Sequence, residues 1–225
     1  AASATVGPIF PPSIPMVIYA MLSGASIGKL FMGGMVPGVL LAILLMIYVA
    51  FISHKRNYPA GVVMSKREFL KATLQALPAL FTVVILLGGI YSGICTPTEA
   101  GAVASAYALI ISALIYKTLG WKKLWGIIKK SAANTATLAL LCGTSMLFSY
   151  IISLEQVPRV VASLVMGITD NKYIFLFIVN IVFLLLGCVL DVSTIQLVFV
   201  PMVLPLVQAM GIDLVHFGVV ICLNM

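Results

Sequence analysis

The sequence predicts an all-α polytopic membrane protein, and two observations support this fold class. Of the 225 residues, 62% are hydrophobic and 8% are charged, with a mean hydropathy of +1.20. Soluble domains carry about a quarter charged residues, so a water-soluble globule is excluded. An α-helix needs roughly 17–25 apolar residues to cross the hydrocarbon core. Uncharged runs of sufficient length occupy 30–53, 72–98, 100–116 and 131–154.

The two chain ends and the four cysteines narrow the interpretation of the sequence further. Both ends fall within apolar sequence, and the first residues lack the basic region and cleavage site of a signal peptide, so we expect a fragment of a larger protein. The cysteines show no metal-ligand spacing and are predicted to be small buried side chains. They are Cys95, Cys142, Cys188 and Cys222.

Basic residues concentrate in two polar stretches, 53–72 and 117–130, with five lysines or arginines in each. Short loops rich in these residues stay on the cytoplasmic side, so both stretches are predicted to be cytoplasmic. The net charge of +7 would also suit nucleic-acid binding. Because the basic residues stand at the boundaries of spans, the lipid bilayer is the expected partner and nucleic acid is not.

This topology orders the remaining segments. Residues 73–116 are expected to cross twice, turning outside near 95–99, and 131–152 to form a further span. The charges of 153–172 cancel, as an external loop allows. Within 117–130, tryptophans and aliphatic residues share one helical face opposite most of the lysines, which predicts an amphipathic helix lying in the membrane interface.

Prolines interrupt the first apolar stretch. Residues 7–15 contain four prolines, which cannot continue a helix because each lacks an N–H and clashes with the preceding turn. Unpaired backbone at membrane depth is tolerated only where it is buried in protein or lines a cavity, and secondary transporters bind ions at such breaks. Ser13 stands where it would cap the second half-helix, with Pro15 in the first turn. The alternative is an external loop rich in prolines.

A lone carboxylate marks a second interruption. Asp191 is the only Asp, Glu, Lys, Arg or His between 173 and 212. An isolated carboxylate in apolar sequence is costly to place in a membrane and is by default a functional-site hypothesis. Together with Ser193 and Thr194 it offers hard oxygen ligands, which suit a small hard cation.

Two placements of this carboxylate are open. If 173–190 is a complete span, Asp191 lies at the membrane surface. We expect instead a re-entrant hairpin with its tip at 191–194, because the sequence stays apolar up to Gly211 and prolines are placed to break it. Those prolines are Pro201 and Pro205.

Two smaller features have structural interpretations. Glu99, three residues after Thr96, is predicted to cap a helix start. The pairs Gly33-Gly34 and Gly88-Gly89 are predicted to allow close helix packing rather than binding.

Short motifs follow one another along the whole chain: Gly-Pro-Ile-Phe-Pro-Pro-Ser-Ile-Pro at 7–15, Gly-Met-Val-Pro-Gly at 34–38, Gly-Ile-Cys-Thr-Pro-Thr-Glu-Ala at 93–100, Leu190-Asp191, and Gly-Ile-Asp-Leu-Val-His-Phe-Gly at 211–218. In this order they resemble the large membrane subunit of TRAP (tripartite ATP-independent periplasmic) transporters. The resemblance implies an inverted-repeat, elevator-type transporter with broken helices and re-entrant hairpins. On that template, the transport domain takes 1–52, a broken helix and the following span, and 173–225, a re-entrant hairpin and the start of a second broken helix. The spans of 73–116 resemble the scaffold.

The resemblance also implies a function, namely sodium-coupled uptake of an organic acid, a dicarboxylate or a sialic-acid-like carboxylate, across the bacterial inner membrane. A periplasmic binding protein and a small membrane (Q) subunit are the implied partners. Sodium is the implied coupling ion, and no organic cofactor is expected. The sodium ligands carried over from the family are Thr5, Gly7, Pro8 and Ser13 for one site and Asp191, Ser193 and Thr194 for the other. The substrate-binding residues stay unassigned.

Three other functions compete with this one. An ion-coupled carboxylate carrier that works without a binding protein is the nearest. An intramembrane protease needs two facing carboxylates, but neither Asp191 nor Asp213 lies in a Gly-x-Gly-Asp context, and Ser13 has no base nearby in sequence, so no enzyme is expected. A purely structural subunit leaves Asp191 unexplained.

Overall fold

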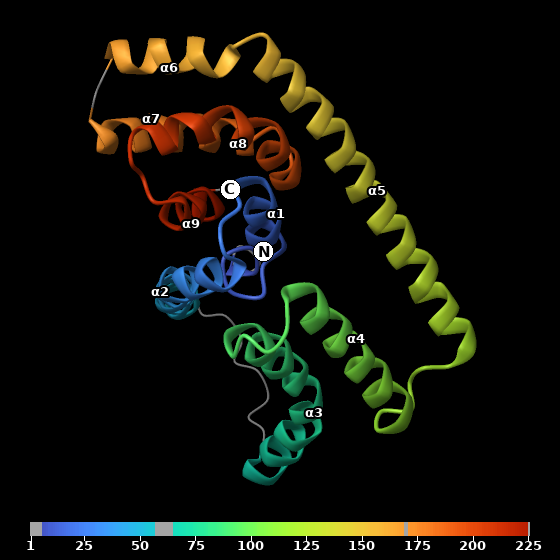
Figure 1. The fold of residues 1–225 in the computed structure, drawn as a ribbon. Coiled ribbons are helices and arrows are strands. Elements are labelled where there is room, and N and C mark those ends of the chain that lie inside the picture. Colours follow the sequence, from blue (N-terminus) through green and yellow to red (C-terminus); the bar gives the residue numbers. More distant parts are fainter. Residues whose placement is uncertain (1–5, 57–64, 169–170, 225) are drawn as a thin grey trace. The chain divides into compact units, whose positions relative to one another are not determined.

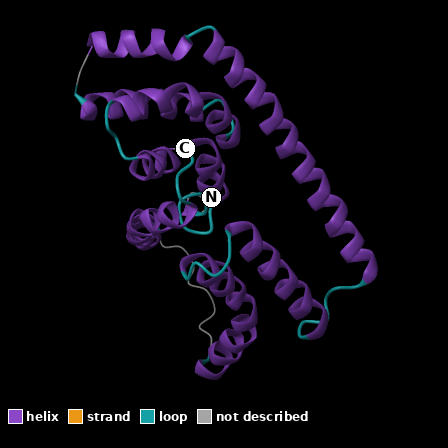
Figure 2. Cartoon of the chain, viewed as in Figure 1, coloured by secondary structure: helices purple, strands orange, loops and turns teal. Residues whose placement is uncertain are grey.

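A computed structural model describes residues 6–56, 65–168 and 171–224, and this part of the chain is helical without a strand (Figures 1 and 2). The all-α fold class is therefore confirmed. In chain order the helices are α1 (Ile14–Ser23), α2 (Ile27–Lys55), α3 (Lys66–Tyr91), α4 (Pro97–Leu114), α5 (Trp121–Leu154), α6 (Val157–Ile168), α7 (Lys172–Gly187), α8 (Val192–Ala209) and α9 (Leu214–Asn224).

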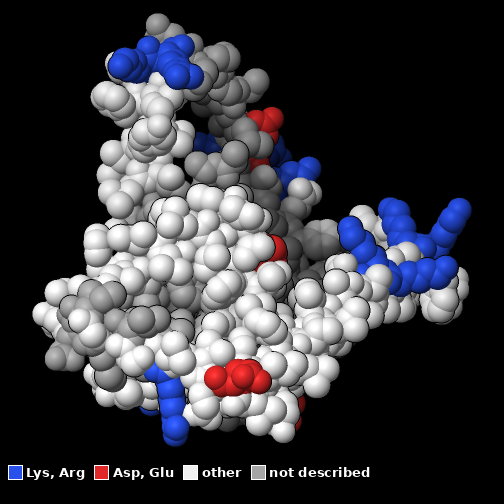
Figure 3. All heavy atoms as spheres, turned by 90° about the horizontal axis from the view of Figure 1, so that it is seen from above, with Lys and Arg blue, Asp and Glu red and all other residues white. Residues whose placement is uncertain are grey.

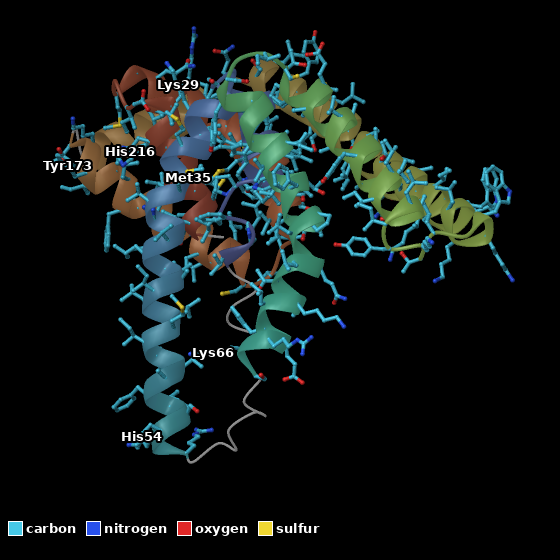
Figure 4. All side chains as sticks on the ribbon, turned by 90° about the horizontal axis from the view of Figure 1, so that it is seen from below. Lys29, Met35, His54, Lys66, Tyr173 and His216 are labelled. Carbon is cyan, nitrogen blue, oxygen red and sulfur yellow. The ribbon has the colours of Figure 1, made fainter. Side chains whose placement is uncertain are left out.

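Five of the described helices are long and apolar enough to cross a membrane, judged by length and composition, and these are α2, α3, α4, α5 and α8. Most of the face in Figure 3 carries no charge, and the lysines and arginines stand there in separate groups. In α2 the polar residues stand toward the ends, with Lys29 near the first end and His54 near the second (Figure 4). This distribution is typical of helices that span lipid.

The chain divides into two compact units, Ala1–Ala42 with Ala133–Met225, and Ile43–Ala132. The second unit is built on the contacting pair α3 and α4. A short turn at 92–96 joins them, slightly before the predicted turn near 95–99, because α4 already begins at Pro97. Glu68 accepts a 2.9 Å hydrogen bond from the Ser65 amide at the start of α3. Glu99 does the same for the Thr96 amide at 2.8 Å, which confirms the predicted cap of α4.

Two tyrosines, Tyr107 within α4 and Tyr116 just after its end, form hydrogen bonds to α3. The Tyr107 hydroxyl donates to the carbonyl of Pro78 at 3.2 Å, and the Tyr116 hydroxyl donates to that of Gln75 at 2.5 Å. Both acceptors lie within one turn of Pro78, a proline inside α3. α3 thus continues through its proline, and two of its main-chain carbonyls near Pro78 accept hydrogen bonds from tyrosines of the neighbouring segment.

In the first unit, α1 packs against α8 and α9, and α9 also contacts α7 (Figure 1). Tyr19 of α1 is fully buried in this core. Its ring centroid lies 6.4 Å from that of Phe217, and a Cβ added to Gly218 of α9 would lie against the Tyr19 ring. Gly33 of α2 approaches Val219 of α9 closely as well, because a Cβ added to Gly33 would lie 3.1 Å from Val219 Cγ2. These close approaches explain the small residues at this interface.

The glycine predictions are confirmed in part. Gly33 and Gly34 both lie under neighbouring groups, and Gly89 lies within contact distance of Ala100 and Cys95. Gly88 has nothing within 4 Å of an added Cβ, so it serves no packing within the described residues.

Pro201 and Pro205 do not break the apolar stretch, contrary to the expectation from the sequence. Pro201 and Pro205 both lie inside α8, which continues to Ala209, and Pro37 lies inside α2. A proline removes one hydrogen bond and bends a helix, but packing of the surrounding apolar residues can hold the helix together. In α8 that packing is provided by buried residues on both sides of the prolines, namely Ile195, Leu197, Val200, Leu206 and Val207.

Two predicted boundaries are also corrected. The segments 117–130 and 131–152 share one continuous helix, α5, because nothing at 129–133 breaks it. The predicted loop 153–172 contains α6, and the predicted loop 53–72 includes the start of α3 at Lys66. The side of the membrane on which each segment lies stays a prediction.

The cysteines differ from the expectation of uniform burial. Cys222 is buried, Cys95 and Cys142 are half-buried, and Cys188 is exposed. Cys188 lies in the turn between α7 and α8, where no helix packs over it within the described residues.

Candidate functional site

The first candidate group lies before α1. Residues 6–13 form turns rather than α-helix, so the predicted interruption is present, whereas Thr5 lies outside the described residues. Ser13 caps α1 as predicted, since its Oγ accepts a 3.4 Å hydrogen bond from the Met16 amide. The same hydroxyl donates to the carbonyl of Pro8. Ser13 is only 3% exposed, so the hydroxyl and the Pro8 carbonyl are two oxygens brought together away from bulk solvent.

Glycines of α2 let the turn segment approach closely. A Cβ on Gly34 would lie 2.8 Å from the carbonyl oxygen of Ile9, and one on Gly38 would lie 3.1 Å from Phe10 Cδ2. The turn is therefore packed against α2 rather than extended into solvent, and Ile9 is only 4% exposed. This favours the functional break over a loose external loop.

The second candidate group lies between α7 and α8. The turn at 188–191 joins the two helices, and Asp191 is the N-cap of α8. One oxygen of Asp191, Oδ2, accepts a 3.0 Å hydrogen bond from the Ser193 amide. Ser193 and Thr194 are half-buried in the first turn of α8, and Asp191 itself is exposed. The three residues predicted together thus share one helix start.

The two groups are not joined by a hydrogen bond within the described part of the chain. They belong to one unit, because α1 follows the first group, α8 follows the second, and the two helices pack on each other. Each group stands at the N-terminus of its helix. The positive end of the helix dipole therefore points at each set of oxygens.

Amide side chains at this core were missed by the sequence analysis. Gln196 of α8 is fully buried, and its Nε2 donates to Cys222 Sγ of α9 at 3.5 Å. Its Oε1 has no hydrogen-bond partner among the described residues. Asn224 Nδ2 donates to the carbonyl of Asn180 in α7 at 2.6 Å. The available signal was an uncharged amide inside an apolar run, as at Gln196.

The two groups contain the oxygen types that a small hard cation can accept as ligands, and the cation itself stays a prediction. Hydroxyl, carbonyl and carboxylate oxygens are ligands for small hard cations, and the groups contain all three. Within the described residues there is no cluster of His, Cys, Asp and Glu that would hold a transition metal. Asp213, the other carboxylate of this region, caps α9 by accepting a 2.8 Å hydrogen bond from the His216 amide.

Comparison with known proteins adds the family. The sequence profile described as "Tripartite ATP-independent periplasmic transporter, DctM component" matches residues 1–225. The chain is 41% identical over 225 residues to the sialic acid TRAP transporter large permease protein SiaM of Vibrio cholerae, covering 100% of this chain and 53% of the relative. It is 38% identical over 221 residues to the C4-dicarboxylate TRAP transporter large permease protein DctM of Pseudomonas aeruginosa, covering 98% and 52%.

A third relative is the isethionate TRAP transporter permease protein DctMQ of Oleidesulfovibrio alaskensis, 37% identical over 226 residues, covering 100% of this chain and 36% of the relative. The chain thus spans about half the length of the large permeases that it matches. The match over its whole length agrees with the multi-pass architecture and with a place in the bacterial inner membrane. The chain therefore belongs to the DctM family of large permeases of tripartite ATP-independent periplasmic transporters.

Proposed function

We propose that this chain is part of a sodium-coupled permease that carries an organic acid across the inner membrane. The observation that carries the proposal is the position of Asp191, a carboxylate at the start of α8 after the apolar helix α7. No lysine or arginine lies between Lys172 and Met225 to compensate it. A bound sodium ion would supply the missing charge.

The helix N-terminus compensates Asp191 only in part. The dipole acts as roughly half a positive charge, so a net negative charge remains when the carboxylate is ionised. At membrane depth this charge is costly, and the two ways to remove it are a bound cation and protonation. Ser193 and Thr194 carry hydroxyl oxygens in the first turn of α8, directly after the carboxylate in sequence, which favours the cation.

The first group supplies a second set of oxygens. Ser13 Oγ and the Pro8 carbonyl already meet, and the turn at 6–13 leaves further carbonyls, that of Gly7 included, outside helical pairing. Thr5 belongs to the proposed set by family resemblance alone. The proposed sodium ligands are Thr5, Gly7, Pro8, Ser13, Asp191, Ser193 and Thr194.

The substrate and partners are proposed from the relatives. Their names specify sialic acid and C4-dicarboxylates, which supports an organic acid as the substrate class. The family name describes a tripartite periplasmic system, which supports a small membrane subunit and a periplasmic binding protein as partners. This description also disfavours the alternative, a carboxylate carrier that works without a binding protein.

The test is uptake by the full-length permease, reconstituted in proteoliposomes with its small subunit. Labelled sialic acid and a labelled C4-dicarboxylate are offered with sodium or potassium outside, with and without the binding protein. We expect uptake of one acid that needs both sodium and the binding protein. Sodium-dependent uptake without the binding protein would establish the alternative, and uptake driven by a proton gradient alone would contradict both.

Asp191→Asn tests the site within the same assay, with Asp213→Asn as the matched control. Both carboxylates cap a helix, and asparagine caps as well as aspartate, so helix stability changes little in either variant. We expect Asp191→Asn to weaken the apparent sodium affinity about ten-fold, the equivalent of a lost charged ligand, and Asp213→Asn to leave it unchanged. Equal sodium dependence in the two variants would remove Asp191 from the site.

A further inference from the structure

The unit Ile43–Ala132 contains a groove that is separate from the two candidate groups at 6–13 and 191–194. It has a volume of about 570 Å³ and lies between α3 and the end of the α4 segment. Its lining residues are Lys71, Leu74, Gln75, Pro78, Ile115 and Tyr116. We propose that this groove binds the headgroup and upper acyl chain of an anionic phospholipid.

The groove has a charged end and an apolar end. Along α3 its lining runs from Lys71 near the helix start, through Gln75, to Pro78 two turns further in. Leu74 and Ile115 add apolar walls. A phospholipid has the same order, with a phosphate at the interface and hydrocarbon below it. A free phosphate ion would use only the first half of the groove.

The charge around the open end suits an anion. Arg67 lies one helical turn before Lys71 on the same face, and Lys66 stands at the start of α3 (Figure 4). Lys117 directly follows Tyr116. The nearby acid, Glu68, is occupied in capping α3 through the Ser65 amide. Basic pockets between transmembrane helices are known to receive anionic headgroups, because each lysine or arginine adds attraction that falls off within a Debye length.

A hydrogen bond within the groove determines which of its side chains can donate to a ligand. Tyr116 uses its hydroxyl proton on the Gln75 carbonyl, so the phenol holds the two helices at this distance and offers no proton to a ligand. The Gln75 side chain and the Lys71 ammonium remain as donors that line the groove. Lys71 therefore contributes the charge, and Leu74 and Pro78 contribute the contact with the acyl chain.

Native mass spectrometry of the purified full-length permease in neutral detergent tests this assignment. The protein is titrated with phosphatidylglycerol or with zwitterionic phosphatidylethanolamine, and a third arm adds inorganic phosphate as competitor. We expect tighter binding of phosphatidylglycerol and no displacement by phosphate. Equal binding of the two lipids, or displacement by millimolar phosphate, would overturn the proposal.

Three single substitutions test whether the lipid binds in this groove. Lys71→Gln is expected to weaken phosphatidylglycerol binding about five-fold, the effect of one basic side chain near the headgroup. Leu74→Trp fills the groove without a change in charge and is expected to weaken binding as well. Lys122→Gln, an exposed lysine at the start of α5 outside the groove, is the matched control and should have no effect. Equal weakening by Lys71→Gln and Lys122→Gln, or undiminished binding in Leu74→Trp, would overturn the groove as the site.

Discussion

The Tyr19 hydroxyl of α1 donates a 2.7 Å hydrogen bond to the main-chain carbonyl of Leu214, the first residue of α9. These residues are 195 positions apart, and the bond joins the helix after the proline-rich turn to the last helix described. Because the Tyr19 ring is fully buried, its polar atom needs such a partner. The link holds α1, and with it the capping Ser13, in a fixed place in the core.

Tyr19→Phe tests this link directly. The variant keeps the ring packing against Phe217 and removes only the hydroxyl. We expect the free energy of unfolding of the purified full-length permease to fall by about 1 kcal/mol, the net contribution of one hydrogen bond. Denaturation in mixed micelles measures it. The control is Tyr48→Phe, where the residue is 59% exposed and no loss is expected. An equal loss in both variants would contradict the role of the Tyr19 bond.

Gly218→Ala tests the close approach of α9 to α1 and α2. The added Cβ would fall on the Tyr19 ring and within 2.7 Å of Leu30 Cδ2, so one of these buried side chains must move. We expect destabilisation by about 1–3 kcal/mol, the usual cost of overpacking a core. Gly126→Ala is the control, because nothing lies within 4 Å of its Cβ and alanine is the better helix former. Unchanged stability in Gly218→Ala would contradict the close approach of α9 to Tyr19 and Leu30.

Ser13 has two roles to separate, a helix cap and a proposed sodium ligand. Replacing a capping serine by alanine costs about 1 kcal/mol, whereas glycine costs only a few tenths. If the hydroxyl binds sodium, Ser13→Gly and Ser13→Ala should both weaken the sodium dependence of uptake to a similar degree, although only Ser13→Ala loses stability. The two measurements are uptake against sodium concentration and thermal unfolding. Normal sodium dependence in Ser13→Gly would leave Ser13 with the cap alone.

The predicted topology is tested by single-cysteine labelling with a membrane-impermeant maleimide. Cysteine is introduced at Ser65, Lys122 or Gln156 on a background in which the four native cysteines are replaced by alanine. The positive-inside rule predicts labelling from outside only at Gln156, because the other two sites lie in the basic stretches. Labelling of permeabilised cells controls for access to all three. External labelling at Ser65 or Lys122 would reverse the assignment.

The sequence by itself determined the fold class, the pair α3 and α4, and the caps of α1 and α4. Each cap is complete within a few residues, as in the bond between the Thr96 amide and Glu99 or that between Ser13 Oγ and the Met16 amide. Such interactions depend on local spacing, which is readable from the chain alone. The cap formed by Asp191 was not predicted, because the sequence analysis placed 191–194 at a hairpin tip, whereas the structure begins α8 directly after Asp191.

Only the tertiary structure determined the features that depend on contacts between residues far apart in sequence. Pro201 and Pro205 remain within α8 because buried neighbours hold that helix against α1, and local propensity for a break is overcome. Gln196 is buried beside Cys222 of another helix, a pairing that no local pattern indicates. Gly218 is small because Tyr19 fills the space above it. In each case the deciding energy comes from packing between helices, and packing partners are set by the fold rather than by neighbours in sequence.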